Sequence, residues 1–121
     1  MVIEGHTFNV WLAETNSQRT LGLMNVSSDE LPPDWGMLFV FSEPMPLAFW
    51  MKYTITPLDI AFIGADGVIV KTHTMPPLTL QSFPSQKPAQ FALEVNAGRF
   101  AELDIGEGDA VLLPASVVGG Q

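Results

Sequence analysis

The sequence predicts a mainly β fold, either an antiparallel β-sandwich or a partly closed barrel, with one or two short helices. Apolar residues fall into many short runs of strand length, and ten prolines and ten glycines lie between those runs. Short strands with proline-rich corners are typical of sandwiches and barrels. A length of 121 residues suits one domain with its own core.

The first half of the chain is expected to supply four strands and a helix. In residues 7–13, Phe8, Val10 and Leu12 alternate with polar or outward positions, as in a half-buried strand. Thr15 and Gln18 have the spacing of a capping box, which predicts that a short helix begins after Thr15 and continues toward Leu21. Further strands are predicted at residues 37–41, 48–51 and 58–63, separated by prolines.

The second half begins with the strongest local signal, Asp66-Gly67 between two apolar runs, which predicts a β-hairpin. Residues 75–88 carry four prolines and are expected to form an irregular surface loop. A strand is predicted at 91–95, then a short helix over 99–103 capped by residues 96–98. A turn at 106–109, in which Asp109 accepts from nearby amides, leads into a last strand at 110–113.

Composition excludes several classes of function. A net charge of −8 repels phosphate backbones, so we expect no nucleic-acid partner. The chain has no cysteine and no histidine pair at metal-binding spacing, so we predict no metal site and no cofactor. No apolar run reaches the length of a membrane span. We expect a soluble protein, either cytoplasmic or exported with its signal segment absent from this sequence.

Trp50 and Lys52 are the first candidate site residues. In an extended segment they share one face, while Phe49 and Met51 share the other. The indole could stack on a sugar or heterocycle while the ammonium meets a carboxylate or phosphate. The alternative is structural, with a packed tryptophan beneath a lysine whose charged end reaches solvent.

Asp59 and Glu94 each interrupt an apolar strand, and a carboxylate removed from water needs a partner. Lys52 and Arg19 are the expected partners. The two acids could work as general acid and base, or they could belong to a structural ion-pair network. Arg19 could equally hold an anionic ligand.

These residues leave three functions open. We predict a module that binds a small ligand or a partner in a cleft floored by Trp50 and Lys52, with Arg19, Asp59 and Glu94 as further contacts. The first alternative is an enzyme, a hydrolase or lyase with Asp59 or Glu94 as general base and Lys52 as electrostatic stabiliser. The second is a protein interaction module that docks through a sheet edge or through the loop at 75–88. The oligomeric state is left open.

A set of short motifs runs along almost the whole chain: Arg19, Gly22-Leu23-Met24, Gly36-Met37-Leu38-Phe39, Phe49-Trp50-Met51-Lys52, Pro57-Leu58-Asp59-Ile60, Leu93-Glu94, Gly98 and Gly108-Asp109. In these motifs the chain resembles the family called domain of unknown function 192, uncharacterised proteins of bacteria and archaea. The resemblance implies a mostly β, sandwich-like domain with no established activity. Two departures stand out: Tyr53-Thr54 where the family usually has Asn-Thr, and no cysteine in the proline-rich loop. We expect one domain over 1–121, with a family-like core at about 11–113 and a tail at 114–121.

Overall fold

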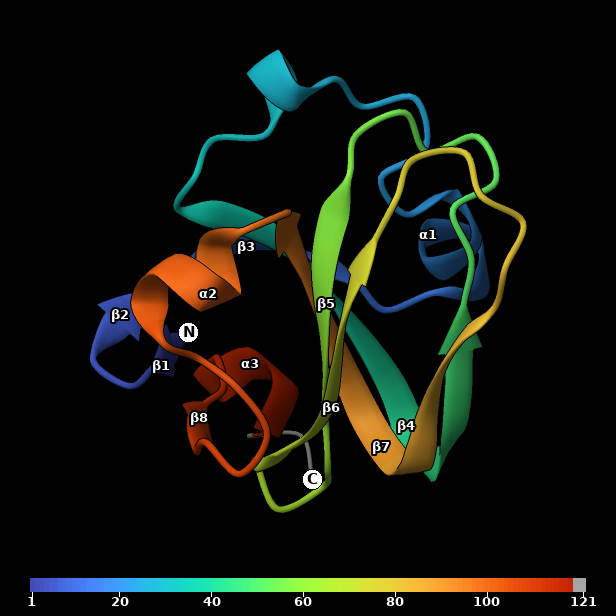
Figure 1. The fold of residues 1–121 in the computed structure, drawn as a ribbon. Helices are drawn as coiled ribbons and strands as arrows, with labels where there is room; N and C mark the ends of the chain where they lie inside the picture. The colour runs from blue at the N-terminus through green and yellow to red at the C-terminus, as the bar shows by residue number, and fades with distance from the viewer. Residues whose placement is uncertain (119–121) are drawn as a thin grey trace.

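A five-stranded sheet with the order β3-β4-β7-β5-β6 forms the centre of the computed structural model, which describes residues 1–118 (Figure 1). β3 and β4 run parallel, and the other neighbouring strands are antiparallel. The predicted mainly β fold class is confirmed, with the parallel β3–β4 pair as an exception to the expected antiparallel order. The strands are β3 (Asn9–Ala13), β4 (Trp35–Phe49), β5 (Leu58–Ile63), β6 (Ile69–Met75) and β7 (Phe83–Asn96).

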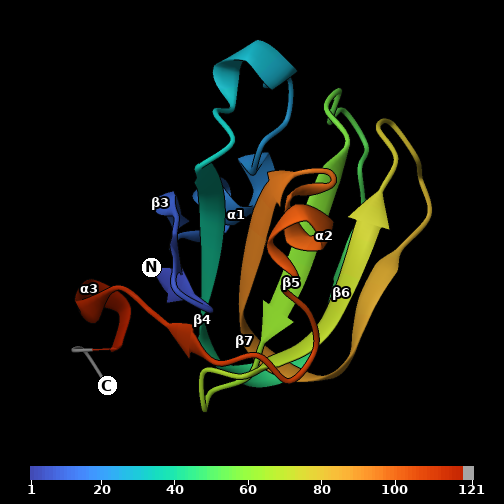
Figure 2. The same ribbon diagram turned by 60° about the vertical axis from the view of Figure 1, so that its left-hand side comes forward.

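A small second sheet and the short helices pack around this centre. The small sheet has the order β2-β1-β8, from β1 (Val2–Ile3), β2 (His6–Thr7) and β8 (Val111–Leu112). The small sheet, α2 and α3 lie on one side of the large sheet and α1 lies on the other (Figures 1 and 2). The helices are α1 (Asn16–Leu21), α2 (Arg99–Leu103), α3 (Ala115–Val118) and the 3₁₀ turn η1 (Ser28–Glu30).

The large sheet is buried on both faces because neighbouring residues of a strand point in opposite directions. Along β5, Ile60 and Phe62 pack on the α1 side. Ala61 and Ile63 pack on the α2 side, together with residues of the small sheet. All six residues of β5 are buried, which explains why its sequence is almost continuously apolar.

The second halves of β4 and β7 turn back over the α1 side of the sheet (Figure 1). The β4–β7 pairing shifts register between Val40 and Met45, where the two strands bend. The returning part of β4 brings Phe49 onto the sheet, with ring centroids 4.8 Å from Phe39 and 5.7 Å from Phe62. These edge-to-face contacts fix the Phe49 ring in the hydrophobic core.

Several predicted elements are confirmed. Asp66 and Gly67 lie in the turn between β5 and β6, which pair as an antiparallel hairpin. Thr15 caps α1, its hydroxyl accepting from the Gln18 amide while the Gln18 side chain accepts from the Thr15 amide. Asp109 accepts from the amide of Gly106 at 2.8 Å, as a turn acid should.

Three boundaries differ from the sequence prediction. Pro44 and Pro46 do not interrupt β4. β3 ends before them, so this part of β4 pairs with β7 alone; Pro44 lies within the register shift between Val40 and Met45, and Pro46 lies opposite Pro88. The predicted strand at 48–51 ends at Phe49. The irregular loop expected at 75–88 covers only 76–82, because β7 already begins at Phe83.

The C-terminal region also differs in part. The helix expected at 99–103 is present, but the Asn96 side chain donates to the carbonyl of Leu31 and does not cap it. Part of the expected tail at 114–121 forms α3, whose Val117 is buried in the core on the α2 side. The last three positions of that tail, 119–121, lie outside the described residues.

Candidate functional site

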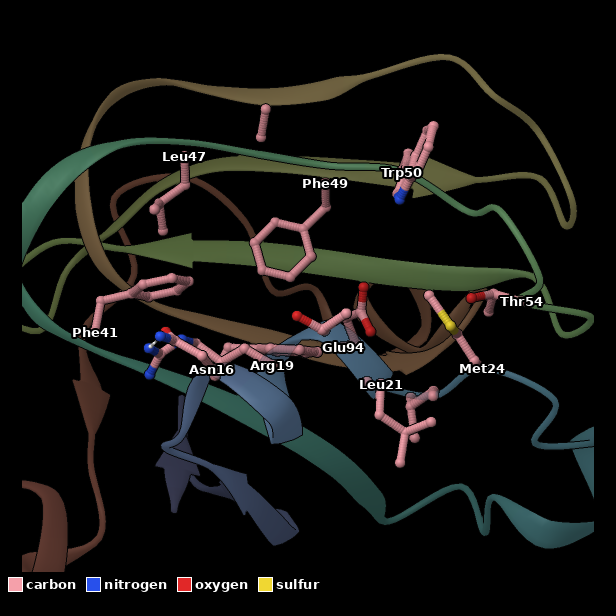
Figure 3. A pocket seen from close by; sticks show the side chains of 15 residues that line it. Asn16, Arg19, Leu21, Met24, Phe41, Leu47, Phe49, Trp50, Thr54 and Glu94 are labelled. Carbon is pink, nitrogen blue, oxygen red and sulfur yellow. Dashed lines mark hydrogen bonds between the residues drawn. The ribbon is translucent and has the colours of Figure 1, made fainter.

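A cleft of about 460 Å³ opens between α1 and the returning half of β4; we call it the α1–β4 cleft (Figure 3). Its walls are mainly apolar, and β7 supplies Glu94 between them. In Figure 3, Phe49 and Trp50 lie on one side of Glu94, and Arg19 and Leu21 lie on the other. The cleft has the size and apolar lining typical of a site for a small organic molecule.

Glu94 is the most unusual group in this cleft. It lies on the central strand β7, between Met37 of β4 and Ile60 of β5, and only 4% of its surface is exposed. Within residues 1–118 its carboxyl group has no hydrogen-bond or ion-pair partner, and its oxygens reach the open space of the cleft. Burial raises the pKa of Glu94 from 4.5 to about 8, because the charged form loses its hydration. The carboxyl group is therefore mostly protonated at neutral pH.

Thr54 is a second buried polar residue in the cleft. Its exposed fraction is 6%, and its hydroxyl makes no hydrogen bond to any residue in the described part of the chain. Its backbone is fixed: the amide donates to Met51 and the carbonyl accepts from the Leu78 amide. No side-chain oxygen in the described chain is both fully buried and unpaired, so this hydroxyl reaches the open space of the cleft. Thr54 and Glu94 thus offer two uncommitted polar groups to one cleft.

Arg19 also lines the cleft, but its guanidinium group is largely committed to backbone contacts. It donates to the carbonyls of Glu14 (2.6 Å) and Val40 (2.7 Å) and to the Asn16 side chain (2.6 Å). It also lies 5.0 Å from the ring centre of Phe41. The prediction that Arg19 holds Asp59 or Glu94 is wrong, because its acceptors are all uncharged. Arg19 ties α1 to β4.

Trp50, Lys52 and Tyr53 form a group at the edge of the cleft. The Lys52 ammonium lies 5.2 Å from the Trp50 ring centre and 5.1 Å from that of Tyr53. Trp50 is 51% exposed, so it is not a tryptophan buried in the core. Trp50 lines the cleft, whereas Lys52 is not among the lining residues. The expected proximity of Trp50 and Lys52 is present, although the residue at the base of the cleft is Glu94.

Asp59 lies on the opposite face of the sheet. Asp59 is paired with Val95, and Ile60 is paired with Glu94, so the two acidic side chains point in opposite directions. The Asp59 carboxylate accepts from the Thr74 hydroxyl at 2.8 Å and from the amides of Gly98 and Phe100 at 3.0 and 3.1 Å. It therefore caps α2, and the expected ion pair with Lys52 or Arg19 is wrong.

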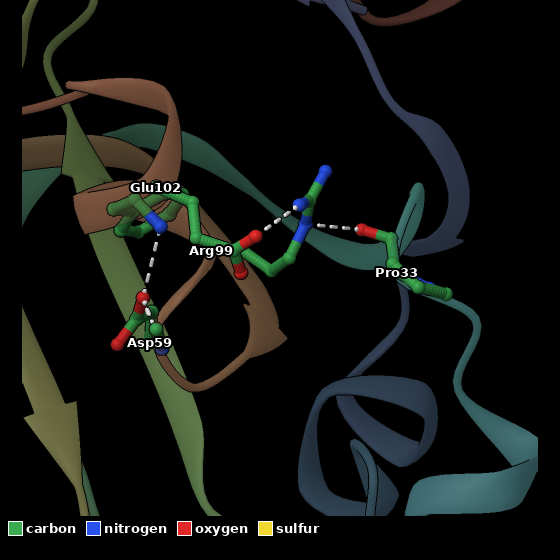
Figure 4. A network of polar contacts seen from close by, with 6 residues as sticks. Pro33, Asp59, Arg99 and Glu102 are labelled. Carbon is green, nitrogen blue, oxygen red and sulfur yellow. Dashed lines mark hydrogen bonds and ion pairs between the residues drawn. The ribbon is translucent and has the colours of Figure 1, made fainter.

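A small polar network surrounds the same helix (Figure 4). Arg99 donates to the Pro33 carbonyl at 2.9 Å and forms a 3.3 Å ion pair with Glu102. Asp59 approaches the start of α2 from β5. These contacts attach α2 to the sheet and to the segment before β4, and we interpret them as structural.

The structure thus brings three of the five candidate site residues to one cleft: Arg19, Trp50 and Glu94. Sequence reasoning missed Thr54 and the contribution of Phe49. An acid between apolar neighbours revealed Glu94. Thr54 carried no comparable signal, because a threonine near a turn is most often exposed.

The comparisons with known proteins give the chain a family. The model of the DUF192 family, described as "Uncharacterized ACR", matches residues 1–113. The chain belongs to this family. The search of curated proteins found no significant match to this chain. The resemblance inferred from the sequence motifs is confirmed.

Two solved structures are similar to this DUF192 domain. A Sinorhizobium meliloti protein described as a candidate transcription regulator is 40% identical, with a TM-score of 0.81 over 85% of this chain and 79% of that chain. A Novosphingobium aromaticivorans protein of unknown function is 34% identical, with a TM-score of 0.83 over 88% and 75%. Among residues 1–118, no helix of the DUF192 domain has the length and apolar character of a membrane span.

Proposed function

We propose that this DUF192 domain binds a small organic ligand in the α1–β4 cleft, with Glu94 as the polar anchor. The observation that carries the proposal is Glu94, whose side chain is almost wholly buried while its carboxyl oxygens reach the open space of the cleft without a protein partner. Burying an ionisable group in this way costs free energy of folding. A ligand that hydrogen-bonds to Glu94 would recover part of that free energy. A residue with a purely structural role would have its hydrogen-bond partner within the protein, and Glu94 has none in the described chain.

The surrounding residues supply the rest of such a site. Phe49 and Trp50 offer ring surface, and the Thr54 hydroxyl offers a second hydrogen-bonding group. Arg19 borders the cleft and keeps α1 in place through its bonds to the backbone. In this proposal Lys52 supports the Trp50 ring from outside the cleft, and Asp59 contributes to stability by capping α2.

A thermal-shift screen tests this function. The purified domain is screened against small aromatic and aliphatic compounds that carry one polar group, and the screen is repeated with Glu94→Gln and Glu107→Gln. Glu107 is an exposed acid in the turn at 106–109, outside the cleft. A ligand at about a hundred times its Kd adds about 2.7 kcal/mol of stability. We expect stabilising compounds whose effect falls in Glu94→Gln and persists in Glu107→Gln. Equal effects in both variants contradict the proposal.

Catalysis is the second candidate, favoured by the raised pKa of Glu94, about 8, which leaves a proton to donate at neutral pH. Such a role would be a hydrolase or lyase reaction with Glu94 as general acid or base; Asp59, on the opposite face, takes no part. The test follows any bound compound by NMR for product. Turnover that Glu94→Gln abolishes while binding persists favours an enzyme, whereas binding without turnover favours a binding module.

A further inference from the structure

We propose that the ligand of the α1–β4 cleft is a compact amine, bound as a cation between the Glu94 carboxylate, the Thr54 hydroxyl and the Phe49 ring. This inference deepens the proposed function and rests on it. It names the charge and class of the ligand, which the size of the cleft alone does not determine.

The charges around Glu94 favour a cation. Among residues 1–118, no Lys or Arg nitrogen lies within ion-pair distance of the Glu94 carboxylate. The ion pair found in this part of the chain joins Arg99 and Glu102. Arg19 is the only basic residue among those described that lines the cleft, and carbonyl and amide oxygens hold its guanidinium group. An ionised Glu94 therefore needs its counter-charge from a ligand.

The acceptors and the ring suit an ammonium group. An ammonium group has only donors, and a carboxylate with a threonine hydroxyl provides acceptors for it. Phe49 is directed toward Glu94 in Figure 3, and its contacts with Phe39 and Phe62 hold it in place. Aromatic faces attract cations that have left bulk water.

The lining favours an organic cation over a metal ion. Across residues 1–118, no three His, Asp or Glu side chains gather into a metal-binding cluster, and Glu94 is the single acid of the cleft. Hard divalent cations take several oxygen ligands, which apolar walls do not provide. Those walls suit the hydrocarbon part of an amine instead. The net charge of −8 also raises the concentration of cations near the protein.

Binding of a cation should depend on pH in a defined way. The ammonium group requires an ionised Glu94, whose pKa in the free protein is about 8. Arg19, from α1, is the charged group that shares the cleft, and its hydrogen bonds run to uncharged oxygens. The amine stays protonated to about pH 10. Affinity should therefore rise about tenfold per pH unit up to pH 8 and then level off.

Probes that share one ring test the class of ligand. Tryptamine, tryptophol and indole-3-acetate carry an amine, an alcohol and a carboxylate on the same indole, and cyclohexylamine, cyclohexanol and cyclohexanecarboxylate repeat the series on a smaller ring. Each is titrated into the ¹⁵N-labelled domain at pH 8 and pH 6. We expect an amine to bind at least tenfold more tightly than its alcohol and acid, with shifts at the amides of Thr54 and Glu94.

Variants locate the effect. Glu94→Gln should remove the advantage of the amine over the alcohol, and it keeps the shape of the protonated side chain, so the fold should persist. Thr54→Val should weaken amine binding severalfold without involving the carboxyl group, which keeps the test valid if Glu94→Gln does not fold. Glu107→Gln, outside the cleft, should change nothing.

The outcomes separate the two proposals. If the alcohols or acids bind the cleft more tightly than the amines, the cationic class is overturned and the proposed function stands. An amine affinity that is equal at pH 6 and pH 8 also overturns the cationic class. If none of the six compounds shifts a residue of the cleft at millimolar concentration, both proposals are overturned.

Discussion

Glu94 puts an ionisable group between two strands in the centre of the sheet, where its charge is costly. No ion pair or hydrogen bond stabilises the charged form of Glu94 there, since the described chain gives its carboxyl group no partner. Instead the carboxyl group takes up a proton and becomes neutral, because burial favours the uncharged form. Stability and the availability of the charged form are therefore opposed at this residue.

That opposition predicts how stability depends on pH. The folded pKa, about 8, lies above the ordinary value of 4.5, so the folded state binds more protons than the unfolded state between these values. The contribution of Glu94 is most favourable below about pH 4.5 and falls as pH rises to 8, by about 1.4 kcal/mol per unit. Glu94→Gln should therefore match the wild type near pH 5 and exceed its free energy of unfolding at pH 8, as measured by urea denaturation. A difference that is the same at both pH values would contradict the assigned pKa.

Tyr53 predicts a second effect at a single residue. Its φ is +64°, a left-handed conformation that costs a side chain about 1 kcal/mol and costs glycine almost nothing. Tyr53→Ala and Tyr53→Gly both remove the ring contact with Lys52, so they differ mainly in this backbone cost. We expect the free energy of unfolding of Tyr53→Gly to exceed that of Tyr53→Ala by about 1 kcal/mol, and its melting temperature to be correspondingly higher. Equal stability of the two variants would count against backbone strain.

At the scale of elements, Asp59 shows how a strand can cap a helix. Gly98, at the N-terminal end of α2, has no side chain to accept from the first amides, and the Asp59 carboxylate of β5 accepts from two of them. Charge-assisted bonds to a buried carboxylate are stronger than neutral ones. α2 has only five residues, so its stability depends on this contact.

Asp59→Ala should therefore lower the free energy of unfolding by about 2–4 kcal/mol, because it leaves two amides and the Thr74 hydroxyl without their acceptor. Lys52→Ala should cost less than about 1 kcal/mol, because its ring contacts are near the surface. Thermal and urea unfolding of the two variants measures both values. Similar losses would restore the Asp59–Lys52 network that the sequence suggested.

The elements that the sequence predicted correctly depend on local signals. The Asp66-Gly67 hairpin and the Thr15 capping box act within a few residues, so their chemistry can be read directly from the chain. The continuation of β4 through Pro44 depends on where β3 ends, and the partner of Asp59 in α2, the Phe100 amide, is 41 residues away along the chain. Such contacts follow from tertiary packing, which one sequence does not encode locally.

For the whole molecule, the sheet separates a supporting face from a binding face. The small sheet, α2 and α3 cover most of the α2 side (Figure 2), where a smaller pocket of about 290 Å³ lies beside Asp59 and Phe100. The α1 side contains the larger α1–β4 cleft. The sequence singled out both Asp59 and Glu94 as inward acids. It could not separate them into a cap and a candidate anchor, since their faces follow from the pairing of β5 with β7.

This division predicts that stability and binding can be changed independently. Ile63→Val, on the α2 side, should lower the free energy of unfolding by about 1 kcal/mol and leave tryptamine affinity unchanged. Trp50→Ala should weaken tryptamine binding severalfold, because the indole lines the cleft, and cost no more than about 1 kcal/mol, since half of that side chain is already exposed. Urea unfolding and NMR titration of each variant give the two quantities. If Ile63→Val weakens binding as much as Trp50→Ala does, the two faces are coupled through the sheet and the supporting face is part of the site.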